Sequence, residues 1–184
     1  PQNTNRQDQV LRAVEALGPA AIPPLAQRLA NDNDPVAARA LAHVGPEAVA
    51  PLSQALTNQN AKVRQAVALG LESTSAHSKA LVPALIRNLK DQDVLVRAYA
   101  ASALGRLRQE PATVVPALAG SLEDSSAEVR LSAAQALGHF GSQATPAIPA
   151  LLQAAKARDN RLYRAIFNSL KQIDTEAAQR AGVK

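Results

Sequence analysis

Four polar side chains near the carboxyl end of the chain have the spacing of a single helical face. They follow one another at i, i+3, i+7 and i+10: Arg161, Arg164, Asn168 and Lys171. A positive face of this kind would attract an acidic partner, and Lys156 and Arg158 precede it closely. A solvated face is the alternative, because exposed charges contribute little free energy.

Three arginines recur at one position of a repeating pattern, 33 residues apart: Arg64, Arg97 and Arg130. Asp91 and Asp124 recur at the same interval. The arginines would form either a basic ladder for the phosphates of a partner, or a structural ladder that bonds the aspartates and the turn carbonyls of adjacent repeats. The matching acids favour the structural ladder, since interior positions of a repeat array mainly hold neighbouring repeats together.

The histidines do not have the arrangement of a metal site. His43 and His139 share the motif Ala-Leu-x-His-Val/Phe-Gly, and Arg106 occupies the equivalent position of another repeat. A metal needs several converging ligands, whereas about three repeats separate these histidines, or roughly 30 Å at a helix spacing of 8 to 10 Å. A cation in the last turn of a helix is explained by the negative helix end. His77 lies in a polar link, where we expect it to be solvated, and we expect neither metal nor cofactor.

Sequence motifs for catalysis are absent. The chain has no phosphate loop, no HExxH and no Gly-x-Ser-x-Gly, and it contains no cysteine that could act as a nucleophile or a zinc ligand. The acidic residues are spread through turns and helix starts, where helix capping explains them. We therefore expect a protein that is not an enzyme.

The elements that must position these side chains are set by apolar residues that recur every 33 positions. One series is Val49, Val82, Val115 and Ile148, and a second is Val63, Val96, Val129 and Leu162. Upstream the interval shortens to 27, from Leu25 to Leu52 and from Leu29 to Leu56. Two apolar series per period predict two amphipathic helices per repeat. We expect one domain over residues 1–184, with short repeats up to about 57, long repeats from about 58 to 173 and a tail over 174–184.

Local residue types agree with helical hairpins. Short polar side chains that could cap a backbone N–H precede the second helices: Asn33, Asn60, Asp93, Ser126 and Asp159. Prolines fall inside the first helices, where we expect them to cause kinks: Pro83, Pro116 and Pro149. The last helix has the heaviest apolar face, from Leu162 to Ile173, and we expect it to close the array.

Two short motifs support a family resemblance. Asp-x-x-x-x-Val-Arg occurs at 91–97 and 124–130, and Ala-Leu-Gly at 103–105 and 136–138. With the bent first helices, these motifs resemble the HEAT family, particularly the short HEAT-like repeats of phycobilin lyases, over about residues 5–173. The resemblance implies an all-α, right-handed superhelix of about five and a half hairpins, with the second helices lining a concave groove.

The amino-acid composition limits the classes of protein to which this chain could belong. Apolar residues make up 47% of the chain and charged residues 19%, which favours a folded protein. The net charge of +5 is concentrated at the carboxyl end, where residues 156–184 carry seven basic and three acidic residues. No apolar run is long enough to span a bilayer. We expect a soluble protein, cytoplasmic or exported after removal of a signal, and the first segment resembles half a repeat of a longer chain.

Non-catalytic binding of another protein is the function that these observations favour. Along the groove, the second helices offer the polar residues Gln65, Ser102, Gln135 and Asn168. One alternative is an enzyme or chaperone of the phycobilin lyase type, although two Tyr, two Phe and no Trp offer little surface for a tetrapyrrole. Another is nucleic-acid binding, by resemblance to HEAT-like DNA glycosylases. The shortage of aromatic rings disfavours base stacking.

Overall fold

The computed structural model describes residues 14, 16–71, 76–157 and 159–182, with side chains left out at 76–78 and 180–182. These residues form eleven α-helices, α2 to α12, and four 3-10 helices, and none of them lies in a strand. The all-α fold predicted from the sequence is confirmed. The chain divides into two compact units, Pro1–Ala84 and Leu85–Lys184, which are described separately.

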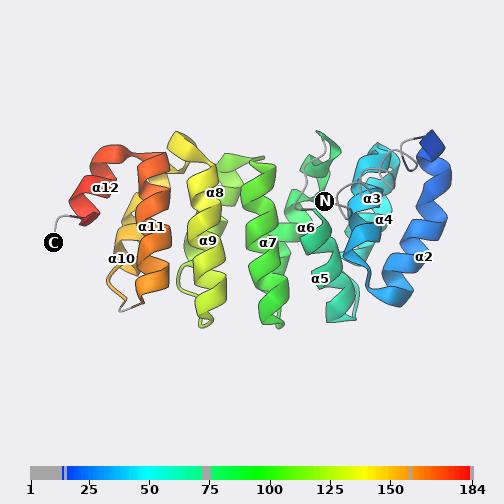
Figure 1. Cartoon of the computed structure of the whole chain (residues 1–184), viewed down its shortest axis with the longest axis horizontal. Helices are drawn as coiled ribbons and strands as arrows, with labels where there is room; N and C mark the ends of the chain where they lie inside the picture. Colours follow the sequence, from blue (N-terminus) through cyan, green and yellow to red (C-terminus); the bar gives the residue numbers. More distant parts are fainter. Residues whose placement is uncertain (1–13, 15, 72–75, 158, 183–184) are drawn as a thin grey trace, which may run out of the picture. The chain divides into compact units, whose positions relative to one another are not determined.

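The first unit consists of short helical hairpins. Its elements are η1 (Gly18–Ala21), α2 (Ile22–Asp32), α3 (Pro35–Val44), η2 (Pro46–Ala48), α4 (Val49–Ala55), α5 (Ala61–Gly70), η3 (Ala76–Leu81) and the start of α6 (Val82–Asn88). α3 packs against α2 and against α5, and α4 packs against α5 (Figure 1). Leucines at the predicted apolar positions, among them Leu29, Leu52 and Leu56, are almost fully buried.

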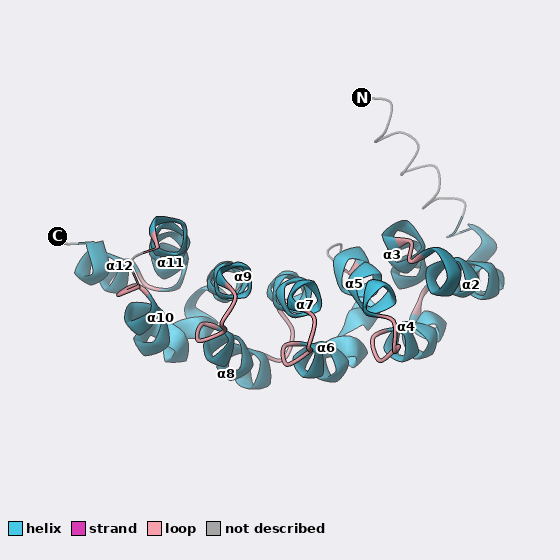
Figure 2. Ribbon diagram, turned by 90° about the horizontal axis from the view of Figure 1, so that it is seen from below, coloured by secondary structure: helices cyan, strands magenta, loops and turns pink. Residues whose placement is uncertain are grey.

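The second unit repeats the same hairpin with longer helices. After the end of α6 it contains α7 (Val94–Leu107), α8 (Pro111–Ser121), α9 (Ala127–His139), η4 (Gly141–Ala147), α10 (Ile148–Ala154), α11 (Asn160–Ile173) and α12 (Thr175–Gly182). α9 packs between α7 and α11, whereas α8 and α10 form a second layer behind them (Figure 2). Leu104, Leu137 and Leu151 lie in this core with no exposed surface.

Two glycines bring the second helices of this unit close together. A Cβ atom placed on Gly105 would lie 2.5 Å from the Cα of Ala136, and one on Gly138 would lie 2.8 Å from the Oγ of Ser169. Ser169 in turn places its hydroxyl 2.7 Å from the carbonyl oxygen of Ala134. The Ala-Leu-Gly motif is therefore a packing motif, because only a residue without a side chain permits this approach.

Three of the five expected helix caps are confirmed. Asn60, Asp93 and Asp159 accept backbone N–H groups in the first turns of α5, α7 and α11. The prediction for Asn33 is wrong: Asn33 is left-handed (φ 53°) and ends α2, and Asp34 caps α3 instead. Asn tolerates this conformation better than most residues. Ser126 has the backbone conformation of a cap, but its side chain accepts no hydrogen bond there.

The prolines act differently from the sequence prediction at two of three positions. Pro83 and Pro149 are the second residues of α6 and α10, and each follows a 3-10 helix, η3 or η4. Proline fits the first turn of a helix, where its missing N–H costs nothing. Only Pro116 lies inside an α-helix, α8. The first element of these two hairpins is thus a 3-10 helix followed by an α-helix.

The carboxyl-terminal segment is more ordered than a tail. Residues 175–182 form α12, which packs against α11 and buries Ala177 and Ala178. Asp174 starts this helix by accepting the N–H groups of Glu176 and Ala177. α11 therefore does not close the described array alone, since α12 covers part of it. None of the described helices combines the length and the apolar character that crossing a membrane requires.

Candidate binding surface

A polar depression of about 320 Å³ lies on the exposed face of the three second helices in the second unit. α7 contributes Ser102 and Arg106, α9 contributes Ser132, Gln135 and His139, and α11 contributes Asn168, Ser169 and Gln172. No carboxylate lines it. Its hydroxyl, amide and cationic groups can bind polar backbone and anionic side chains, but they contain no pair of acid and base arranged for catalysis.

The repeat itself assembles this depression. Ser102, Gln135 and Asn168 are separated by 33 residues, so they occupy the same position on three neighbouring helices. Arg106 and His139 are equivalent in the same way. Three of the residues predicted for binding thus line a single surface, whereas Arg106, His139 and Gln172 join it without having been predicted as binding residues. The equivalence of Arg106 and His139 was the signal that could have identified them.

The fourth residue predicted for that surface lies elsewhere. Gln65 belongs to α5 in the first unit, and its relative exposure is only 9%. α5 packs closely against α3: a Cβ atom at Gly70 would lie 2.7 Å from the Cβ of Ala38. Gln65 is a buried residue of a hairpin core, and its prediction as an exposed binding residue is wrong.

The basic face predicted on the last long helix is exposed. Arg161, Arg164, Asn168 and Lys171 all lie on the solvent side of α11. The Lys171 ammonium lies 4.6 Å from the centre of the Phe167 ring, a distance that permits a cation–π interaction. Because Asn168 also lines the polar depression, the cationic residues border that surface directly.

Arg161 extends the basic face toward the amino-terminal ends of α9 and α11. It lines a second depression of about 640 Å³ together with Ser126, Glu128, Gln135 and Asp159. Gln135 belongs to both depressions, so they adjoin. Lys156 is exposed and its ammonium lies 2.8 Å from the Oε1 of Gln153, while Arg158 lies outside the described residues.

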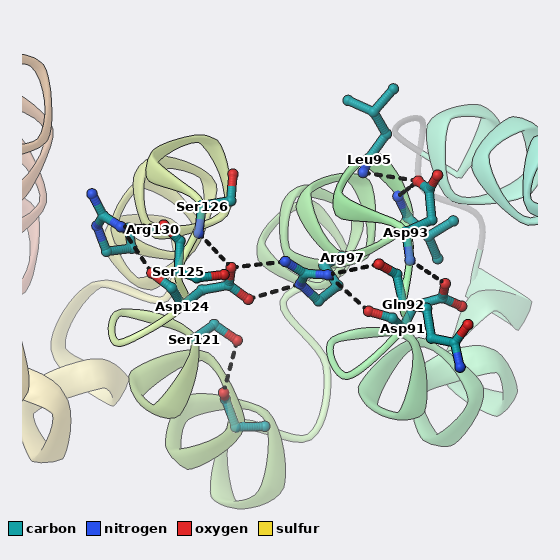
Figure 3. Close-up of polar contacts among 12 residues, drawn as sticks. Asp91, Gln92, Asp93, Leu95, Arg97, Ser121, Asp124, Ser125, Ser126 and Arg130 are labelled. Atoms are coloured by element: carbon teal, nitrogen blue, oxygen red, sulfur yellow. Dashed lines mark hydrogen bonds and ion pairs between the residues drawn. The ribbon is translucent and has the colours of Figure 1, made fainter.

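The repeated arginines make structural bonds. Arg97 donates through Nε and Nη2 to the two carboxylate oxygens of Asp124, at 2.8 and 2.9 Å, and its Nη1 donates to the carbonyls of Asp91 and Gln92 (Figure 3). The hydrogen bond from Arg97 lowers the pKa of the Asp124 carboxyl and raises that of Arg97 itself. This ion pair connects two successive hairpins.

The other two arginines bond turn carbonyls in the same manner. Arg64 donates to the carbonyls of Asn58 and Gln59, and Arg130 donates to those of Asp124 and Ser125. These carbonyls belong to the hairpin of the arginine itself, which differs from the prediction of bonds to turns of adjacent repeats. The six-residue separation from Arg130 to Asp124 explains it, because the side chain folds back over its own turn.

The described histidines have different environments. Nδ1 of His43 lies 2.9 Å from the carbonyl oxygen of Arg39, one helical turn earlier, whereas His139 is exposed. The side chain of His77 lies outside the described residues. Within the part of the chain that the structure describes, no three histidine, aspartate or glutamate side chains are grouped as metal ligands.

A larger depression of about 680 Å³ lies between α6 and α8. Ile86, Leu89, Pro116, Ala117 and Gly120 line its apolar part. Its charged groups include Arg97 and Asp124, which already satisfy each other. Lys90, Asp91 and Glu123 also line this depression, so its surface is partly polar, and it contains none of the residues predicted for partner binding.

Stacked helical hairpins with a polar second-helix face define a helical repeat protein. The sequence pattern of HEAT repeats matches residues 49–137 and 115–181, and the chain therefore belongs to the HEAT repeat family. A comparison with curated proteins finds no match.

Several solved structures with a similar fold are engineered proteins. One engineered protein is 22% identical, with 94% of this chain and 85% of that chain covered and a TM-score of 0.58. A designed armadillo repeat protein in complex with the peptide (KR)4 is 18% identical, with coverage of 95% and 86% and a TM-score of 0.61. Designed armadillo repeat proteins for modular peptide recognition are 19% identical, with coverage of 95% and 86% and a TM-score of 0.55. At these identities the likeness establishes the fold.

Proposed function

We propose that this chain is a non-catalytic binding protein that holds an acidic segment of another protein across α7, α9 and α11. The observation that carries the proposal is the continuous polar surface formed by equivalent residues of three helices, Ser102, Gln135 and Asn168. Amide and hydroxyl groups can donate to and accept from the backbone of a bound segment. Residues at equal intervals suit an extended segment that crosses successive helices.

The charge of this surface sets the chemistry of the partner. Arg106 and His139 lie within the depression, and Arg161, Arg164 and Lys171 border it. Among the residues that line the adjoining depression, the acidic ones are Glu128 and Asp159, and Asp159 caps α11. Complementary charge steers association and increases its rate. A similar fold binds the basic peptide (KR)4 in a designed armadillo protein; the cations here favour a peptide of opposite charge.

The other candidate functions have less support. A HEAT-like protein of the phycobilin lyase type would act as an enzyme or chaperone, yet this chain has only two Tyr and two Phe with which to stack a tetrapyrrole. Addition of a bilin followed by an absorbance scan tests that function. For nucleic acid, stacking on aromatic side chains normally contributes about 1–3 kcal/mol per base, and the depression contains no Tyr, Phe or Trp.

Peptide binding tests the proposal directly. Fluorescein-labelled peptides of alternating Asp and Glu, and of alternating Lys and Arg, are compared by fluorescence anisotropy and stopped flow. We expect binding of the acidic peptide alone. In the triple variant Arg161→Glu, Arg164→Glu and Lys171→Glu, the association rate should fall by about tenfold at low salt and lose its salt dependence.

A matched variant controls for net charge. Lys62→Glu, Arg87→Glu and Lys90→Glu change three exposed cations on other elements, α5, α6 and the turn after α6, and should leave the association rate nearly unchanged. Gln135→Trp fills the depression at an exposed position and should weaken binding without affecting the fold. Equal rates for the two triple variants, or binding of a single-stranded oligonucleotide in place of the acidic peptide, would contradict the proposal.

A further inference from the structure

Asp124 shows how this repeat binds a carboxylate at the turn between a first and a second helix. One of its oxygens, Oδ2, accepts Nε of Arg97 at 2.8 Å, and the other, Oδ1, accepts Nη2 of Arg97 at 2.9 Å and the backbone N–H of Ser126 at 2.8 Å. The side chains of Arg97 and Asp124 are each only 13% exposed. Three donors from two hairpins thus surround one carboxylate.

The next hairpin presents the same arginine in the same way. Nη1 of Arg130 is anchored to the turn carbonyls of Asp124 and Ser125 at 2.8 and 3.0 Å, just as Nη1 of Arg97 is anchored to Asp91 and Gln92 at 2.9 and 3.2 Å. Figure 3 shows the two guanidinium groups in equivalent positions beside their turns. Arg130 is therefore held in place on one edge, and its Nε and Nη2 edge corresponds to the edge that binds Asp124.

The residue that should supply the carboxylate is missing from the sequence. The position 33 residues after Asp124 is Ala157, whose methyl group cannot accept a hydrogen bond. The turns at Asp124 and Ala157 have the same backbone hydrogen bond. The N–H of Asp124 donates to the carbonyl of Ser121 at 3.3 Å, and the N–H of Ala157 donates to the carbonyl of Ala154 at 3.1 Å. Within the described part of the chain, Arg130 has no ion pair with a carboxylate.

The geometry points to a carboxylate-binding site at Arg130, and we propose that it takes an aspartate or glutamate side chain of a partner polypeptide. The donors are Nε and Nη2 of Arg130 and the backbone N–H of Asp159, which is equivalent to the N–H of Ser126. Asp159 has an extended backbone (φ −121°, ψ 105°) like Ser126 (φ −81°, ψ 127°). The planar fork of arginine matches the two oxygens of a carboxylate.

This inference goes beyond the proposed function, because Arg130 is not part of the second-helix surface formed by Ser102, Gln135 and Asn168. It is also independent of the charge-reversal test, which leaves Arg130 unchanged. The exposed ammonium of Lys156, at the same turn, adds positive charge. A bound carboxylate would give this turn the contact between neighbouring hairpins that Asp124 provides one repeat earlier.

Ala157→Asp tests the site from within the chain. The new carboxylate should occupy the place equivalent to that of Asp124, bond Arg130 and Asp159, and raise the midpoint of thermal unfolding by about 2 to 4 °C. The matched variant Ala155→Asp places the same charge two residues away, at a half-buried position of the same turn, and should give no such increase. An unchanged midpoint for Ala157→Asp would show that the Arg130 fork does not reach this position.

Nuclear magnetic resonance tests binding directly, with acetate and a blocked Gly-Asp-Gly peptide as probes. In the full chain, the Nε–H resonance of Arg130 and the backbone resonance of Asp159 should shift together and saturate with both probes. A Gly-Asn-Gly peptide should cause no shift, and Ala157→Asp and Arg130→Gln should remove the response. Asp124→Ala exposes the equivalent guanidinium edge of Arg97. The affinity of this variant for acetate gives the value with which the affinity at Arg130 is compared.

Three results would overturn the inference. The first is the absence of any shift in the wild-type protein at concentrations that saturate Asp124→Ala. The second is an Ala157→Asp variant whose resonances shift with the probes as in the wild-type protein, although its own carboxylate should occupy the site. This comparison also keeps the test decisive if Asp124→Ala does not fold. The third is a response to inorganic phosphate with none to acetate or to the aspartate peptide, since the site would then bind a different class of anion.

Discussion

Arg97 and Asp124 show how a pair of residues fixes the distance between two hairpins. Their bidentate ion pair is mostly shielded from solvent, and both partners have further hydrogen bonds to backbone groups. Hydrogen bonds to charged groups typically contribute about 1.5–3 kcal/mol each when buried. The net contribution of such a pair to the free energy of unfolding is smaller than the attraction between its charges, because both groups lose solvation when they are buried.

The pH dependence of stability should reveal this pair. The bond from Arg97 lowers the pKa of Asp124 in the folded state. The ion pair therefore contributes fully to the free energy of unfolding above the pKa of an unfolded aspartate, near 4, and this contribution is lost as pH falls through the lower pKa of the folded state. Asp124→Asn should reduce the free energy of unfolding by about 1–3 kcal/mol at neutral pH. Urea unfolding of both proteins from pH 7 to pH 2 should show this difference shrinking below about pH 4. A difference that stays constant to low pH would mean that the Asp124 charge does not contribute.

At the scale of the helix, glycine positions separate close packing from exposure. In α7, a Cβ atom at Gly105 would lie 2.5 Å from the Cα of Ala136 in α9; in α8, one at Gly120 would have no atom within 4 Å. Alanine favours a helix over glycine by about 1 kcal/mol. The same substitution should therefore act in opposite directions at the two sites.

We expect Gly120→Ala to stabilise the protein by about 0.5–1 kcal/mol, because it restricts the unfolded chain and meets no neighbour. Gly105→Ala should destabilise it by about 1–3 kcal/mol, the usual effect of overpacking, which exceeds the gain in helix propensity. Chemical denaturation of both variants shows whether each substitution raises or lowers the free energy of unfolding. Stabilisation by Gly105→Ala would show that α7 and α9 can separate at little cost.

Truncation of the Leu104 side chain tests the packing between the same helices. It is fully buried in α7, and Leu104→Ala should cost about 2–5 kcal/mol because it leaves a cavity between stacked hairpins. Glu123→Gln, at an exposed turn position, should change the free energy of unfolding by less than about 0.5 kcal/mol. Similar unfolding midpoints for the two variants would contradict the burial of Leu104.

For the whole molecule, stability arises from contacts between neighbouring hairpins, since no single hairpin can bury its apolar face. The described residues contain helices and turns alone. The far-ultraviolet circular dichroism spectrum of the full chain should therefore be that of a helical protein, with minima at the usual helix positions. A substantial sheet component would contradict the fold.

The sequence by itself determined the order of the elements and most of the core. Apolar residues at intervals of 33 and 27 encode two helices per repeat, because helical periodicity and burial follow from local spacing. The caps at Asn60, Asp93 and Asp159 followed from residue type for the same reason, and the exposed basic face of α11 followed from spacing. The 3-10 helices before Pro83 and Pro149 were not evident, since a proline pattern suits either a kink or a first turn.

Only the tertiary structure decided what each helix face contacts. Gln65 and Gln135 have the same residue type on second helices, yet one is buried and the other exposed. They occupy different positions of the repeat, since Gln65 corresponds to the buried Ala98 and Gln135 to Ser102 and Asn168. How closely two second helices approach is set by residues far apart in the sequence, such as Gly105 with Ala136 and Gly138 with Ser169. The polar depression has the same origin, because it forms only where three helices place equivalent residues side by side.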